Sequence, residues 1–160
     1  MTDIRTGFGY DIHRLVEGPY LLLGRVRVPA DKMIDAHSDG DIVLHALAQS
    51  IFSALGLEDI GTHFPDTKKE TEGIDSILLV RKALKEMDER GFVLSNVVVA
   101  IQLQRPKLAD FKASIKDNLA HILALEKERI AVHANTGESV GPIGEGKAVA
   151  CYCVTTLIKE

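Results

Sequence analysis

The sequence has only two cysteines, no cluster of basic residues and no long apolar run. With two thiols, a structural zinc site made of four thiolates is impossible, and the Cys-x-x-Cys spacing of redox and metal motifs is missing. Cys151 and Cys153 stand two positions apart on a predicted strand, and they therefore point to the same face of a sheet. We interpret them as small buried side chains of an intracellular protein.

The charge and the hydropathy of the chain exclude two classes of partner. A formal net charge of −4 without a basic segment is not typical of nucleic-acid binding, and we expect no nucleic-acid partner. An apolar stretch such as residues 97–103 has the length of a strand rather than of a membrane span, and we expect no membrane insertion. Residues 1–5 lack the apolar core of a signal peptide.

The length and the composition fit one domain over residues 1–160. A chain of 160 residues leaves little room for a second domain, and 46% apolar with 26% charged residues suit a filled core under a solvated surface. No internal repeat, linker or low-complexity stretch divides the sequence.

Hydrophobic periodicity predicts three helices between long strands. The first helix is expected to start near Ser38, with Ser38 and Asp41 as a capping box, and to end before Gly56. The other two helices are expected at residues 75–90 and 111–122, with loops at 61–73 and 137–146. Strands are expected at 4–15, 20–23, 25–28, 93–104, 130–135 and 148–158, and the valine-rich strand 93–104 is expected to be buried on both faces. This order indicates an α+β fold, in which helices cover one face of a sheet.

Three residues have the chemistry and the spacing of a catalytic zinc site. Asp11 and His13 stand two apart on a predicted strand and share one face, and His45 lies in the helix that follows Ser38. One carboxylate and two imidazoles make three nitrogen and oxygen ligands, as in catalytic zinc sites that keep a fourth position open. Each residue alone has an ordinary alternative: Asp11 and His13 as surface polar groups, and His45 as a hydrogen-bonded core histidine.

The surrounding string, residues 37–45, strengthens the metal hypothesis. It joins a polar turn, a helix start suited to anions and a histidine one turn later. By itself His37 could be no more than a loop residue at a helix N-terminus.

Five motifs in order and spacing carry a resemblance over almost the whole chain. They are residues 9–13, residues 36–41 with His45, residues 61–67, residues 104–107 and residues 134–138. In these motifs the chain resembles the 2-C-methyl-D-erythritol 2,4-cyclodiphosphate synthase family. The resemblance implies a ferredoxin-like α+β subunit with a mixed sheet, assembled as a homotrimer whose active sites lie between neighbouring subunits.

The resemblance also implies the reaction and its metals. The substrate is 4-diphosphocytidyl-2-C-methyl-D-erythritol 2-phosphate, which is converted to the 2,4-cyclodiphosphate and CMP in the non-mevalonate isoprenoid pathway. Asp11, His13 and His45 match the ligands of one Zn²⁺ per subunit, and Glu138 matches the ligand of Mg²⁺ or Mn²⁺ that binds with the substrate. Without the resemblance, Glu138 would be interpreted as a solvated loop acid.

The resemblance assigns the substrate contacts residue by residue. His37 and Ser38 match contacts to the 2-phosphate and the erythritol, Thr136 matches a residue that orients the phosphates, and the expected catalytic residues are Thr136, His37 and Asp66. Contacts to the methylerythritol hydroxyls match Asp59, Gly61 and Asp66, and the wall of the cytidine pocket matches Pro106, Lys107, Leu108, Ala134 and Asn135. The ordinary alternatives are a turn for Asp66, a strand-end cap for Thr136 and a surface lysine for Lys107.

The chain departs from the family pattern near the phosphates. Lys68 stands where an acid is usual, Glu72 where a lysine is usual, and Ser139 follows Glu138 where a lysine is usual. Residues 144–147 lack the arginine of many bacterial members and resemble the plant-type version. The compartment implied is the cytoplasm, or the plastid stroma if a longer precursor has been trimmed.

Two other functions are compatible with the same residues. A zinc-dependent nucleotide phosphoesterase would need a general base, for which Asp39 and Asp41 are the nearby candidates. A non-catalytic, zinc-stabilised trimeric nucleotide-binding module would need a fourth protein ligand, which His37 or His63 could supply.

Overall fold

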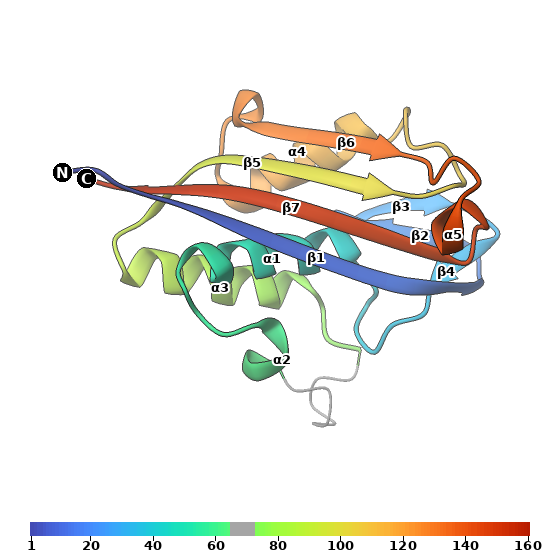
Figure 1. Cartoon of the computed structure of the whole chain (residues 1–160), viewed down its shortest axis with the longest axis horizontal. Helices are drawn as coiled ribbons and strands as arrows, with labels where there is room; N and C mark the ends of the chain where they lie inside the picture. Colours follow the sequence, from blue (N-terminus) through green and yellow to red (C-terminus); the bar gives the residue numbers. More distant parts are fainter. Residues whose placement is uncertain (65–72) are drawn as a thin grey trace.

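The computed structural model describes residues 1–64 and 73–160. Five strands form a mixed sheet in the order β4-β1-β7-β5-β6 (Figure 1). Neighbouring strands are antiparallel except β5 and β6, which run parallel. The strands of this sheet are β1 (Asp3–Glu17), β4 (Lys32–Ile34), β5 (Val93–Gln102), β6 (Ile130–Asn135) and β7 (Ala148–Lys159). A separate hairpin pairs β2 (Tyr20–Leu23) with β3 (Val26–Pro29).

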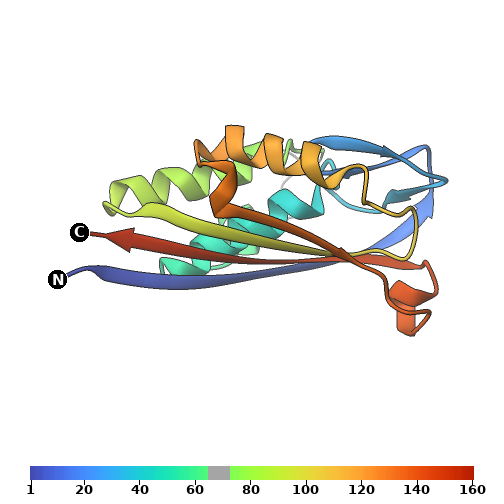
Figure 2. The same cartoon turned by 90° about the horizontal axis from the view of Figure 1, so that it is seen from above.

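The long helices lie on one face of the sheet, which confirms the predicted α+β class (Figure 2). They are α1 (Ile42–Ala54), α3 (Ile77–Glu89) and α4 (Lys112–Leu123). Two short helices, α2 (Ile60–His63) and α5 (Gly141–Gly144), lie where the sequence predicted loops, and a 3₁₀ turn covers Lys127–Arg129. No helix within residues 1–64 and 73–160 is long and apolar enough to cross a membrane.

Two predicted helix starts and one predicted strand need correction. Helix α1 begins after Asp41, whose side chain accepts from the Leu44 N–H at 3.2 Å, and not at Ser38. Helix α3 begins at Ile77, two residues after the predicted start at Asp75, whose side chain nevertheless accepts from the Ile77 N–H at 3.0 Å. Strand β5 ends at Gln102, and from Val97 on its residues alternate between buried and half-buried, because helices cover only one of its faces.

Helix α1 lies in the centre of the core. Ten of its thirteen residues are buried, which means that it is covered on nearly every side by the sheet and by α3. Cys151 and Cys153 are fully buried on the face of β7 that α1 covers, as predicted. The Ser50 hydroxyl of α1 contacts the Cys153 sulfur at 3.4 Å.

Two glycines let α1 lie unusually close to β1. A Cβ atom at Gly9 would stand 1.9 Å from the Ala46 carbonyl oxygen, and one at Gly7 would stand 1.8 Å from the Ser50 carbonyl oxygen. Both obstacles are backbone atoms, which cannot rotate away. Since Gly7, Gly9, Asp11 and His13 alternate along one face of β1, the same approach brings the side chains of α1 to Asp11 and His13.

The opposite face of the sheet carries large apolar side chains without a covering helix. Ile4, Phe8, Tyr10 and Ile12 of β1 are 44–65% exposed. The Tyr10 and Tyr152 rings lie 5.0 Å apart, which extends this face onto β7. An apolar face of this kind is typical of a surface that another protein subunit covers.

We predict that Gly9→Ala lowers the free energy of unfolding by about 3 kcal/mol, because the new methyl group meets backbone atoms of α1. Gly61→Ala is the matched control, since its Cβ would meet no atom closer than 3.6 Å. Chemical denaturation of both variants measures the difference. Equal stability of the two variants would contradict the close approach of α1 and β1.

Candidate metal and substrate site

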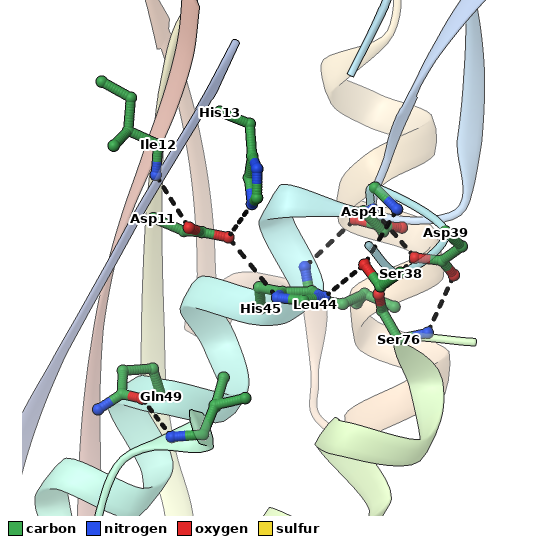
Figure 3. A network of polar contacts seen from close by, with 12 residues as sticks. Asp11, Ile12, His13, Ser38, Asp39, Asp41, Leu44, His45, Gln49 and Ser76 are labelled. Carbon is green, nitrogen blue, oxygen red and sulfur yellow. Dashed lines mark hydrogen bonds and ion pairs between the residues drawn. The ribbon is translucent and has the colours of Figure 1, made fainter. Parts of the chain in front are cut away.

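Strand β1 and helix α1 bring the three predicted metal ligands together (Figure 3). The Asp11 Oδ2 atom lies 3.1 Å from His13 Nε2 and 3.6 Å from His45 Nδ1. In a tetrahedral zinc site with bonds of about 2.0–2.1 Å, ligand atoms stand about 3.3 Å apart. Both distances are close to that separation. The three side chains are half-buried, which leaves the cluster open on one side.

Each histidine is held through the nitrogen that faces away from Asp11. His13 Nδ1 contacts the Asp35 carbonyl oxygen at 3.2 Å, and His45 Nε2 contacts the Ser38 hydroxyl at 3.0 Å. This anchoring is common for histidines that bind metals, because it fixes the ring and leaves the other nitrogen for the ion.

The surroundings of His13 favour a positive charge at its Nε2 atom. The ring lies between two acceptors, the Asp11 carboxylate and the Asp35 carbonyl oxygen. The hydrogen bond to Asp11 is the largest cause that raises the pKa of His13 above its ordinary value. Either a proton or a cation satisfies this arrangement, and the donor set of one carboxylate and two imidazoles fits Zn²⁺. Among the described residues, no group of three His, Cys, Asp or Glu side chains already has the geometry of a complete metal site.

A cavity of about 320 Å³ opens beside these three residues. Four of the predicted substrate contacts line it together with the metal ligands: His37, Ser38, Asp59 and Gly61. Asp59 also caps α2, because its Oδ1 atom accepts from the Thr62 N–H at 3.2 Å. The zinc residues and the residues assigned to the erythritol therefore share one cavity, while Asp66 lies outside the described residues.

Gln49, which was not predicted from the sequence, also lines this cavity. Its Oε1 atom accepts from the Ile60 N–H at 3.0 Å and thereby holds the start of α2 beside the site (Figure 3). Its position four residues after His45 on α1 was the available signal, since residues at that spacing share a helix face.

A second cavity, of about 500 Å³, contains residues assigned to the nucleotide side. Pro106, Lys107 and Thr136 line it, together with four residues that were not predicted: Ala30, Asp31, Gln104 and Arg105. The Gln104 side chain accepts from the Gly137 N–H at 3.1 Å and fixes the chain after β6.

Leu108, Ala134 and Asn135 do not line this cavity with the others. Leu108 is only 4% exposed and packs in the core. Ala134 and Asn135 end β6 next to it, and the Asn135 carbonyl oxygen accepts from the Leu103 N–H at 2.9 Å.

Thr136 holds the predicted second metal ligand, Glu138. The Thr136 hydroxyl accepts from the Glu138 N–H at 3.2 Å and can donate to the Glu138 carboxylate at 3.4 Å. Glu138 is exposed and has a positive φ of 50°, a conformation that costs energy for a residue with a side chain.

The two groups of residues stand far apart within one chain. Asp11 pairs with Cys151, Cys151 with Ile101, and Ile101 with Ala134, which places Asp11 and Ala134 three strands apart. At about 4.8 Å per strand, the separation is about 14 Å. Glu138 follows Ala134 by four residues, in the loop after the end of β6.

Asp39 and Asp41 do not line the metal cavity. Asp41 is fully buried, and burial raises its pKa to about 6, in the range of a general base. Its carboxylate is nevertheless occupied, since it accepts from the backbone N–H groups of Gly24, Arg25 and Leu44 at 2.9, 2.7 and 3.2 Å.

The two candidates for a fourth protein ligand lie in different surroundings. His37 is exposed and lines the cavity. His63 stacks on Phe52, with 4.4 Å between the ring centroids.

Comparisons with known proteins identify the family. The model of the YgbB family matches residues 4–158. The chain belongs to the YgbB family. It is 45% identical over 157 residues to the 2-C-methyl-D-erythritol 2,4-cyclodiphosphate synthase of Fusobacterium nucleatum, and the match covers 98% of each protein. The predicted resemblance is confirmed, and the enzyme interpretation is supported over the phosphoesterase and the non-catalytic module.

Solved structures of the family share this fold. The bifunctional IspDF from Campylobacter jejuni is 38% identical with a TM-score of 0.94, and the match covers all of this chain and 43% of that longer one. The IspF–CDP complex of Plasmodium falciparum is 34% identical with a TM-score of 0.85, and the match covers 98% of this chain and 97% of that one. The fold of this YgbB-family enzyme is therefore that of the cyclodiphosphate synthases.

We predict that Asp41→Asn destabilises the enzyme by about 1–3 kcal/mol, because an amide NH₂ would face the Arg25 N–H or the Gly24 N–H. Asp59→Asn is the matched control at another helix start, where one oxygen suffices and asparagine caps equally well. Urea denaturation measures both. A loss that is the same for Asp41→Asn and Asp59→Asn would contradict the role of the second Asp41 oxygen.

Proposed function

We propose that this YgbB-family enzyme forms the cyclic diphosphate at a site that combines the Asp11 cluster of one subunit with the Thr136 region of the next. An oxygen of the substrate's 2-phosphate attacks the β-phosphorus, the bond from that phosphorus to the bridging oxygen breaks, and CMP leaves with this oxygen. The substrate supplies its own nucleophile. The residues of the protein therefore have to bind, orient and neutralise phosphate groups that repel each other.

The observation that carries the proposal is the meeting of Asp11, His13 and His45 in the cavity that His37 and Ser38 also line. These three side chains would hold Zn²⁺ and leave one position for a phosphate oxygen. The ion, when bound, supplies a Lewis acid that polarises this phosphate. The contacts of Ser38 with His45 and of Asp35 with His13 keep the ligand atoms turned toward the ion.

The groups around the cavity suit the methylerythritol part of the substrate. His37 and Ser38 can donate hydrogen bonds to the 2-phosphate, and Asp59 can accept from a hydroxyl group. Ile60, Phe64 and Leu79 add an apolar wall, which suits the methyl-substituted carbon chain. We include Asp66 among the proposed contacts on the strength of its motif alone.

The second cavity suits the cytidine diphosphate end. Lys107 and Arg105 bring positive charge, Thr136 offers a hydroxyl, and Pro106 offers an apolar surface for a base. Glu138, which Thr136 holds, would bind Mg²⁺ or Mn²⁺ together with phosphate oxygens. Ala134, Asn135 and Leu108 would contribute through the backbone next to this cavity. The Plasmodium falciparum relative is a complex with CDP, which supports a cytidine nucleotide as the ligand here.

A homotrimer of ferredoxin-like subunits would resolve the distance between the two cavities. The separation of about 14 Å within one chain is explained if each site takes its zinc side from one subunit and its nucleotide side from a neighbour. The apolar face with Phe8, Tyr10 and Ile12 would be covered in such an assembly. The compartment remains a prediction, the cytoplasm or the plastid stroma, and a rice relative is named chloroplastic.

The two carboxylates named as bases for the phosphoesterase alternative are not placed for that role. Asp39 and Asp41 are both occupied by donors of the protein and lie outside the cavity lining. A metal-activated water would therefore have no described carboxylate placed to take its proton other than the ligand Asp11 and the cap Asp59.

We predict that the wild-type enzyme releases CMP and a cyclic diphosphate, identified by phosphorus NMR, and that His45→Ala loses both bound zinc and turnover. His121→Ala is the control, because His121 is an exposed histidine of α4 outside both cavities. Elemental analysis gives the zinc content of each variant. Full turnover by zinc-free His45→Ala, or release of linear methylerythritol phosphates by the wild type, would refute the proposal.

A shared active site predicts complementation between inactive variants. In equal mixtures of His45→Ala and Glu138→Ala subunits, refolded together, about one quarter of the sites would combine two intact halves. We expect about that fraction of wild-type activity. A mixture of His45→Ala with Asp11→Ala is the control and should stay inactive, since both changes damage the same half. Equal inactivity of the two mixtures would contradict the shared site.

A further inference from the structure

Asp39 stands in the motif beside His37 and Ser38, and the mechanism above gives it no task. Its Oδ2 atom accepts from the Ser76 N–H at 2.9 Å, and its Oδ1 atom accepts from the Asp41 N–H at 3.0 Å and from the Ser76 hydroxyl (Figure 3). With three donors of the protein around it, this carboxylate is placed to hold structure rather than to move a proton.

Two backbone hydrogen bonds also join the segment around Asp39 to the segment around Ser76. The Gly73 N–H donates to the His37 carbonyl oxygen at 2.8 Å, and the Asp39 N–H donates to the Ile74 carbonyl oxygen at 3.1 Å. Four hydrogen bonds therefore join the turn 37–39 to the segment 73–76, which stands 37 positions further along the chain. The side chains of this turn also bind the start of α1: Asp39 accepts from the Asp41 N–H, and Ser38 contacts His45.

Both joined segments face the metal cavity. His37, Ser38 and Ile74 line it directly, and Ser76 precedes α3, whose Leu79 also lines it. Ser76 is fully buried, and its side chain makes no capping hydrogen bond to α3. The Asp39 carboxylate therefore supplies an acceptor and a negative charge at the N-terminus of α3 from outside that helix.

The turn also reaches the metal ligands. The Ser38 hydroxyl accepts from the Gly40 N–H at 3.2 Å and contacts His45 Nε2 at 3.0 Å. A shift of the turn would move Ser38 away from His45 and His37 away from the cavity at the same time.

We propose that Asp39 is a positioning residue, whose bonds to Ser76 fix the His37–Ser38 turn against the start of α3. The inference rests on the proposed function, because it assumes that His37 and Ser38 bind the substrate. Asp39 acts through these two residues and touches no reacting atom.

The test compares Asp39→Asn with Asp75→Asn. Asparagine at position 39 turns an NH₂ group toward a donor of Ser76 or Asp41, and we expect kcat/KM to fall on the order of 10- to 100-fold. Asp75 is the matched control: it stands one residue before Ser76, accepts from the Ile77 N–H at 3.0 Å and pairs with Arg25 at 2.8 Å, away from the turn. Asp75→Asn should keep wild-type kcat/KM.

Hydrogen exchange gives a readout that needs no activity. In Asp39→Asn the amides of Asp39, Gly73 and Ser76 should exchange faster, while those of β1 and β7 keep their wild-type rates. Ser76→Ala, a milder change, should show the same pattern, and adding it to Asp39→Asn should lower kcat/KM by less than the product of the two single effects.

The outcomes separate the two proposals. Wild-type kcat/KM and wild-type exchange in Asp39→Asn would overturn the positioning role, and so would faster exchange spread over the whole sheet, since that indicates a general loss of stability. Failure of the wild type to form the cyclic product would refute the proposed function, and the exchange pattern would still decide whether Asp39 fixes the turn.

Discussion

The close contact between α1 and β1 is the constraint on which the site depends. It exists because Gly7 and Gly9 have no side chain where the Ser50 and Ala46 carbonyl oxygens approach. Asp11 and His13 occupy the next two positions on the same face of β1. His45 stands one residue before Ala46 on α1. The 3.6 Å between Asp11 Oδ2 and His45 Nδ1 therefore depends on this backbone packing, whereas the 3.1 Å between Asp11 Oδ2 and His13 Nε2 is set within β1 itself.

Around this contact, polar groups fix the ends of the elements. Asp41 caps α1 and simultaneously binds the turn of the β2–β3 hairpin, while Asn118 of α4 donates to the Gly24 carbonyl oxygen of that turn at 3.0 Å. Asp39 performs the corresponding task at α3. The Asp39 and Asp41 carboxylates therefore orient the chain, and the proposed contacts to phosphate are left to the proposed metal ligands, His37 and Ser38.

The local pattern of polar and apolar residues was sufficient to predict the features that depend on neighbours in sequence. The alternation of Asp11 and His13 on a strand, the burial of Cys151 and Cys153, and the class of the fold follow from periodicity, and the structure confirms them. The start of α1 was predicted wrongly, because Ser38 and Asp41 are both good capping residues. Asp41 is the cap because the backbone N–H groups of Gly24 and Arg25, which are distant in sequence, donate to its carboxylate.

The site residues divide in the same way. His37, Ser38, Asp59 and Gly61 were predicted from the family resemblance and do meet in one cavity, whereas Gln49 carried a spacing signal but was not part of that resemblance. The partner of Asp39 could not be predicted from sequence, since Ser76 has no pattern that relates it to a turn 37 positions earlier. Leu108 follows the motif 104–107 and was assigned from the resemblance, but it packs in the core, because a resemblance in sequence records order along the chain and not the direction of a side chain.

Anomalous diffraction at the zinc edge, from crystals grown with zinc and CMP, tests the central claim most directly. The account predicts one peak per subunit about 2.0–2.2 Å from an Asp11 carboxylate oxygen, His13 Nε2 and His45 Nδ1, with the fourth position held by solvent or phosphate. A peak elsewhere, or a fourth protein side chain on the ion, would contradict it.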